Sequence, residues 1–331
     1  MVIIMEIIKE KFNYNLLNSH EFLEKNVCFF DIETTGFNRN KEIIYLIGIL
    51  YYDKKDKNWN IIQLFADELK DEIEVLEKAY RILSTFDLII NYNGNTFDIP
   101  FMNHKFKLFD LNYYISKDKS FDIYSIIRKN KHLLNIKDLK LKTVEKYLDI
   151  NRDDIYTGKD CITFYRNYLL NKDNSLKNKI LQHNYDDLYY LPQVLKILDI
   201  IKKKKSFEIS IDNSKIVFLV DNINISNDFL TIKGTTEDIN SRKILYYGNN
   251  YNIMMDESGI FEIDLEVNKG LITSEETCLF IYKEDYPIIS SCKDKSNYKI
   301  PNNIILISVE DKYITSNIKM ILELLVEKSI K

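Results

Sequence analysis

The hexapeptide DIETTG, at residues 31–36, directly follows the apolar run VCFF at residues 27–30. Side chains alternate between the two faces of a strand, so Asp31 and Glu33 are expected to point to the same side. Two carboxylates that close together repel each other unless a cation lies between them. A solvated polar strand end would explain the same residues, so the motif indicates a metal site only if other segments supply further ligands.

A second acidic segment, NYNGNTFDIP at residues 91–100, follows another apolar stretch at residues 86–90. The Asn-Gly-Asn sequence predicts a turn after a short buried strand. Pro100 favours the first turn of a helix, so Asp98 is expected at a helix start that projects from the end of the same sheet. An ordinary helix-capping aspartate is the alternative.

The third segment, QHNYDDLYY at residues 182–190, lies inside an apolar-periodic stretch from residue 176 to 201. His183 and Asp187 are four residues apart, so on a helix they share a face. The imidazole could orient or deprotonate a water while the carboxylate holds a metal ion. Such pairs also occur on plain helix surfaces.

In their order and residue types, the three segments resemble the DEDD superfamily of 3′–5′ exonucleases. Within that superfamily the chain is most similar to the YprB-type RNase-H-like domain, over about residues 26–200. The similarity extends to SFDIY at residues 120–124 and to LKLKTVEKYLDINR at residues 139–152.

This resemblance implies that the four carboxylates hold divalent metal ions and that His183 lies beside the attacking water. The implied ligands are Asp31, Glu33, Asp98 and Asp187. Superfamily members with a histidine usually place it five residues before the last aspartate, whereas here the spacing is four, as in the tyrosine type. The role of His183 as a general base therefore stays open, and Asp186 is the alternative to Asp187.

The expected cofactors are two Mg²⁺ or Mn²⁺ ions, because the motifs supply hard oxygen ligands and no cysteine. Two such ions stabilise the charge that develops in phosphodiester hydrolysis. Thr34, Thr35 and Asn93 flank the acids and are candidate substrate contacts, although turn formation explains them equally well.

The predicted activity is a 3′–5′ exonuclease on single-stranded or frayed nucleic-acid ends. An endonuclease or structure-specific nuclease on the same scaffold is an alternative, and so is a non-catalytic nucleic-acid- or protein-binding module that retains the fold. The residues do not distinguish DNA from RNA as the substrate.

Composition is compatible with an intracellular enzyme. The chain has 331 residues, 45% of them hydrophobic, so it can form one large core or two modest ones. Its four cysteines are far apart in sequence, which is typical of reduced residues in a cytoplasmic protein. No stretch reaches the roughly 18 apolar residues of a membrane span, and we expect a soluble protein without a signal peptide.

The formal net charge is −4, yet residues 115–146 carry more lysine and arginine than acid. This stretch could contact phosphates, or it could be a solvated helix face.

Two domains are predicted, with residues 1–25 as a lead-in. An RNase-H-like α/β domain is expected at residues 26–204, with a mixed sheet flanked by helices, and a mostly β domain that ends in a helix at residues 205–331. The second domain offers a possible contact for a protein partner. In the first domain, apolar patterns predict strands at residues 27–33, 42–53, 58–65 and 87–92, and helices at residues 71–86, 99–109, 121–130, 137–148, 160–171 and 175–204.

Overall fold

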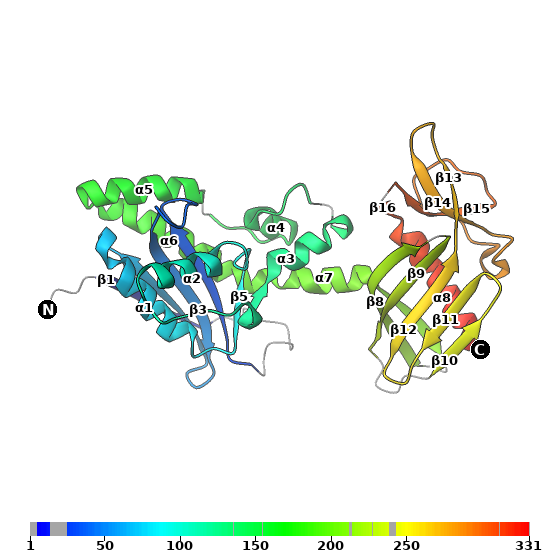
Figure 1. Cartoon of the computed structure of the whole chain (residues 1–331), viewed down its shortest axis with the longest axis horizontal. Helices are drawn as coiled ribbons and strands as arrows, with labels where there is room; N and C mark the ends of the chain where they lie inside the picture. Colours follow the sequence, from blue (N-terminus) through cyan, green and yellow to red (C-terminus); the bar gives the residue numbers. More distant parts are fainter. Residues whose placement is uncertain are drawn as a thin grey trace. The chain divides into compact units, whose positions relative to one another are not determined.

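The computed structural model describes residues 5–13, 25–134, 136–153, 155–211, 214–226, 228–237, 243–310 and 312–330. The chain divides into two compact units, Met1–Asp199 and Ile200–Lys331. The first unit is a mixed sheet flanked by helices, and the second is mostly β, which confirms the predicted fold class (Figure 1).

The sheet of the first unit has six strands in the order β1-β4-β3-β2-β5-β6. Strands β1 to β4 pair antiparallel, whereas β5 pairs parallel with β2 and with β6. The carboxyl ends of β2 and β5 therefore meet at one edge of the sheet, as the acidic segments require. The strands are β1 Met5–Phe12, β2 Val27–Thr34, β3 Ile44–Asp53, β4 Asn58–Ala66, β5 Leu88–Asn91 and β6 Ser120–Asp122.

Two of these strands correct the sequence-based expectation. Strand β1 lies within residues 1–25, which were expected to be a lead-in, and it pairs along its whole length with β4. Charged residues are common in strands at a sheet edge. Because they interrupt the apolar pattern of β1, this strand was not predicted from the sequence. Strand β6 falls partly in the helix predicted at residues 121–130, because three residues are too few to show a period.

The helices of the first unit mostly follow their predicted positions. The helix predicted at residues 175–204 is instead two helices, α6 and α7, separated at Leu195. Pro192 lies in the last turn of α6, three residues before this division. The helices are α1 Glu72–Leu83, α2 Asp98–Leu108, α3 Ile123–Lys129, α4 Leu141–Tyr147, α5 Gly158–Asn171, α6 Asn174–Val194 and α7 Lys196–Lys205, the last of which continues past Asp199 into the second unit.

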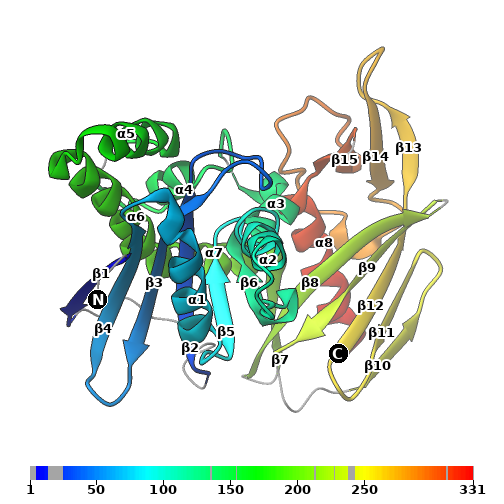
Figure 2. The same ribbon diagram turned by 60° about the vertical axis from the view of Figure 1, so that its left-hand side comes forward.

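Helices α1 and α6 cover opposite faces of the sheet, with α1 in front of the strands and α6 behind them in Figure 2. The register places Asp31, Gly48 and Gln63 side by side on neighbouring strands, on the face that α6 covers. A Cβ atom on Gly48 would lie 2.2 Å from Oδ1 of Asn184 and 2.4 Å from Cδ1 of Leu188. The absent side chain at Gly48 therefore allows α6 to lie directly on the strand next to the acids.

The second unit contains a six-stranded antiparallel sheet in the order β10-β11-β12-β9-β8-β7 and a smaller sheet in the order β13-β14-β15-β16. The larger sheet contributes Phe218 and Phe261 to the core of this unit. Helix α8, Thr315–Ile330, contributes Ile321 and Leu325 to the same core. The strands are β7 Ser206–Ile211, β8 Ser214–Ser226, β9 Phe229–Thr236, β10 Ile244–Tyr247, β11 Tyr251–Met255, β12 Ile260–Glu266, β13 Asn268–Leu271, β14 Thr277–Tyr282, β15 Ile304–Val309 and β16 Lys312–Tyr313. Within the described ranges of both units, no helix has the length and apolar character needed to cross a membrane.

Candidate active site

Strand β2 and helix α6 bring three candidate ligands together. Nε2 of His183 lies 3.6 Å from Oε1 of Glu33 and 3.8 Å from Oδ2 of Asp187. One ligand atom from each residue lies within 4.8 Å of the other two. The i,i+4 spacing on α6 and the alternation on β2 thus point two carboxylates and an imidazole at a common position.

Asp31 lies beside this group and is held by a buried amide. Nδ2 of Asn184 donates to Oδ2 of Asp31 at 2.8 Å, and Oδ1 of Asn184 accepts from Nε2 of Gln63 at 2.9 Å. Burial raises the pKa of Asp31 well above its usual range, and the carboxylates of Asp187, Glu33 and Asp98 raise it further.

Asp98 joins the site from the start of α2. Its Oδ1 accepts from the backbone N–H of Ile32, at 3.2 Å, which ties the carboxylate to β2. Burial raises the pKa of Asp98 to about 7. The preceding loop is held by Asp122, which accepts from the backbone N–H groups of Asn93 and Asn95 at 2.8 and 3.3 Å.

The predicted substrate-contact residues are engaged in turns. Thr34 and Thr35 are both buried; the hydroxyl of Thr34 donates to the carbonyl of Gly36, and that of Thr35 donates to Glu42. Asn93 has a positive φ of 69°, and its side-chain oxygen accepts from the hydroxyl of Thr96. These contacts match the turn-forming alternative, and a role in substrate binding stays a prediction.

The two adjacent aspartates on α6 have different surroundings. Asp187 belongs to the group with Glu33 and His183, whereas Asp186 accepts a hydrogen bond from Nε2 of Gln182 at 2.9 Å and is outside that group. This arrangement favours Asp187 over Asp186 as a ligand, in line with the sequence-based preference.

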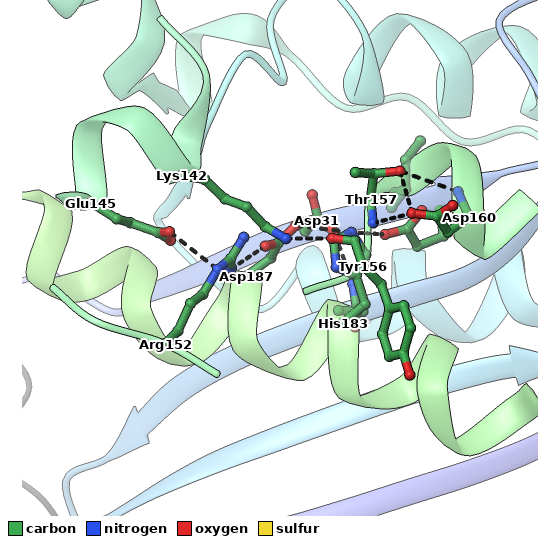
Figure 3. A network of polar contacts seen from close by, with 12 residues as sticks. Asp31, Lys142, Glu145, Arg152, Tyr156, Thr157, Asp160, His183 and Asp187 are labelled. Carbon is green, nitrogen blue, oxygen red and sulfur yellow. Dashed lines mark hydrogen bonds and ion pairs between the residues drawn. The ribbon is translucent and has the colours of Figure 1, made fainter. Parts of the chain in front are cut away.

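Two further residues touch the acids, Asn184 and Arg152, and neither was predicted from the sequence. Arg152 donates through Nη1 to Oδ1 of Asp187, and its Nε lies 3.2 Å from Oε2 of Glu145 (Figure 3). Both residues stand within motifs quoted for the family resemblance, HN at residues 183–184 and the final residue of the stretch 139–152, and that was the only signal available.

A divalent cation fits these residues. The carboxylates offer hard oxygen donors, which suit Mg²⁺ or Mn²⁺, whereas the imidazole of His183 is a softer donor. Asp31 and Asp98 are held in surroundings that disfavour their charged forms, so a nearby cation would remove an electrostatic cost.

Nearly every lysine and arginine side chain in the basic stretch at residues 115–146 is exposed to solvent. Lys142 differs from the others, because it is half-buried and donates to the backbone carbonyl of Tyr156. Exposure is compatible both with a phosphate-binding track and with a solvated face.

The RNase_H_2 family model of the RNase H superfamily matches residues 28–199. No curated protein sequence matches the chain. Among solved structures, E. coli Exonuclease I in complex with a dT13 oligonucleotide is 12% identical with a TM-score of 0.31, covering 63% of this chain and 55% of that chain. An Exonuclease I structure described as suggesting how processivity is achieved is 14% identical with a TM-score of 0.31, covering 66% and 56% of the two chains. A chain described as the apo form of the nuclease is 14% identical with a TM-score of 0.26, covering 53% and 85%. The chain thus spans about half the length of the Exonuclease I chains.

Proposed function

The chain belongs to the RNase H superfamily through its domain at residues 28–199, and we propose that it is a metal-dependent nuclease, specifically a 3′–5′ exonuclease on single-stranded or frayed ends. The observation that carries this proposal is the convergence of Glu33, His183 and Asp187 from two elements far apart in sequence. Asp31, which is half-buried, and Asp98, which is buried, add two more carboxylates to the same surroundings.

In this proposal Asp31, Glu33, Asp98 and Asp187 hold the metal ions. Bound there, two divalent ions would supply an activated water and stabilise charge on the phosphoryl oxygens. His183 faces the same position through Nε2, from which it could accept a proton from a water or orient it. The buried amide of Asn184 keeps Asp31 in one orientation.

An exposed aromatic side chain next to the acids supports a nucleic-acid end as the substrate. Phe37 follows the DIETTG motif directly, is 85% exposed, and meets the ring of Phe97 edge-on at 5.9 Å between centroids. Phe97 in turn precedes Asp98. A base can stack on such a ring whatever its sequence, which suits an enzyme that acts on any end.

The test uses end-labelled DNA and RNA oligonucleotides with free or blocked 3′ ends, in Mg²⁺, Mn²⁺ or EDTA. We expect a ladder from free 3′ ends that requires the metal and disappears in Asp31→Asn and Asp98→Asn. Cleavage of 3′-blocked or circular substrates would instead identify an endonuclease. The absence of cleavage with either metal would refute the enzymatic proposal and leave a binding module.

A further inference from the structure

Arg152 is a buried cation in direct contact with a proposed metal ligand. Its side chain is 5% exposed, and it lies in the loop that follows α4. The guanidinium contacts Asp187 through Nη1 and forms an ion pair with Glu145 through Nε (Figure 3). Glu145 is itself 2% exposed, so the pair is enclosed on its far side.

The two oxygens of Asp187 face different partners. Oδ1 accepts from Arg152, whereas Oδ2 is the atom 3.8 Å from Nε2 of His183. A carboxylate that is fixed at one oxygen cannot rotate freely about its side-chain bonds. The other oxygen then stays directed at the group formed with Glu33 and His183.

From this arrangement, which rests on the proposed function, we infer that Arg152 is a positioning residue that fixes Asp187 for metal binding, and that Glu145 holds Arg152 in place. A guanidinium suits this task because its nitrogens form a rigid planar fork that reaches two carboxylates at once. A lysine has the same charge but cannot span both partners. Residues that orient a metal ligand from behind commonly change metal affinity by about 10- to 100-fold when removed.

Two other roles for the same cation make different predictions. If Arg152 occupied the place of a metal ion and competed with it, removing the guanidinium would tighten metal binding. If Arg152 acted only through its charge, a lysine would replace it. Direct binding of the substrate phosphate is disfavoured by the burial of the side chain.

The experiment measures Mn²⁺ affinity and 3′-end cleavage for the full-length wild type, Arg152→Lys, Arg152→Ala and Glu145→Gln. We expect Arg152→Lys and Arg152→Ala to bind Mn²⁺ about 10- to 100-fold more weakly, and Glu145→Gln to be weakened less. Added guanidinium ion at millimolar concentration should restore Mn²⁺ affinity and cleavage to Arg152→Ala, whereas ammonium should not. Adding Glu145→Gln to Arg152→Ala should cause no further loss, because Glu145 acts through Arg152.

Lys105→Met is the matched control. Lys105 and Glu72 form a buried ion pair, each 3% exposed, with Nζ 3.3 Å from Oε1, and neither residue belongs to the proposed ligand set. This variant should lose stability yet keep wild-type Mn²⁺ affinity, which separates loss of a buried ion pair from loss of positioning.

Wild-type affinity in Arg152→Lys, or tighter binding in Arg152→Ala, would overturn the positioning role. If the wild type itself neither binds Mn²⁺ nor cleaves, the proposed function fails, and the role of Arg152 in metal binding fails with it. Those two results are distinguishable, because only the second affects the wild type.

Discussion

Replacing Gly48 by alanine tests the close packing of α6 on the sheet. The added methyl group would stand 2.2 Å from Oδ1 of Asn184 and 2.4 Å from Cδ1 of Leu188, where ordinary contact begins at 3.4 Å. Either α6 must move away from β3 or the Asn184 amide must rotate. Movement of the amide would break its hydrogen bonds to Asp31 and Gln63.

The expected cost combines two effects. Overpacking a filled interior costs ~1–3 kcal/mol, and leaving a buried partner of the amide without its hydrogen bond costs ~1–3 kcal/mol. Rotation of the amide would relieve the overpacking, so the two costs do not add in full. We therefore expect the free energy of unfolding to decrease by about 3 kcal/mol. For a unit of this size, that loss corresponds to a decrease of roughly 6–12 °C in melting temperature.

Trp59 provides the measurement. It is the single tryptophan of the chain, it is 3% exposed, and it lies on β4 in the first unit, so its fluorescence follows the melting of that unit alone. Gly158→Ala is the control, because its Cβ would meet only Oε2 of Glu33, at 4.0 Å. The control should melt at or slightly above the wild-type temperature, because Gly158 is the first residue of α5 and alanine favours a helix more than glycine does. Equal melting of Gly48→Ala and the wild type would refute the packing argument.

Four further outcomes are expected. In EDTA, the free energy of unfolding should fall as pH rises from the ordinary aspartate pKa of 3.8 to about 7. Burial raises the pKa of Asp98 to about 7, so in this window the folded protein keeps a proton that the unfolded chain has released. Asp98→Asn should make this dependence shallower in pH-resolved urea titrations, and an unchanged slope would contradict it. Millimolar Mn²⁺ should raise the melting temperature of the first unit, since a ligand that binds only the folded state stabilises it by ~2.7 kcal/mol at 100 times its Kd; no shift counts against the metal site. In a cleavage-deficient background, Phe37→Ala should weaken single-strand binding by ~1–3 kcal/mol in fluorescence anisotropy, and equal affinity would exclude stacking on this ring. Calorimetry should show weaker Mn²⁺ binding in Asp187→Asn and unchanged binding in Asp186→Asn, with the reverse order assigning the ligand to Asp186.

The sequence predicted the parts of the site that depend on local periodicity. Alternation along β2 places Asp31 and Glu33 on the same face of that strand. The spacing of four on α6 places His183 and Asp187 on the same face of that helix. Both patterns are properties of a single element, so they can be recognised without knowledge of the tertiary structure.

Contacts between distant segments could not be predicted in this way. Asn184 reaches Asp31 across 153 positions, and Arg152 reaches Asp187 across 35 positions. Neither contact leaves a periodic signal, because the first depends on how α6 lies on the sheet and the second on how the loop after α4 meets α6. The division of the long predicted helix at Leu195 was missed because its apolar pattern continues past Pro192.

Strand β1 bears on where the structural domain begins. The family match starts at residue 28, yet β1 supplies eight residues that pair with β4, from Met5 opposite Ala66 to Phe12 opposite Trp59. A fragment cut at the family boundary would expose the backbone donors and acceptors of β4 along a largely buried, apolar strand. Such an edge is a template for pairing with another chain, and Glu6 would no longer reach Lys177 on α6. The folded sheet therefore extends beyond the segment that the family model matches, and a fragment cut at that boundary would be prone to self-association.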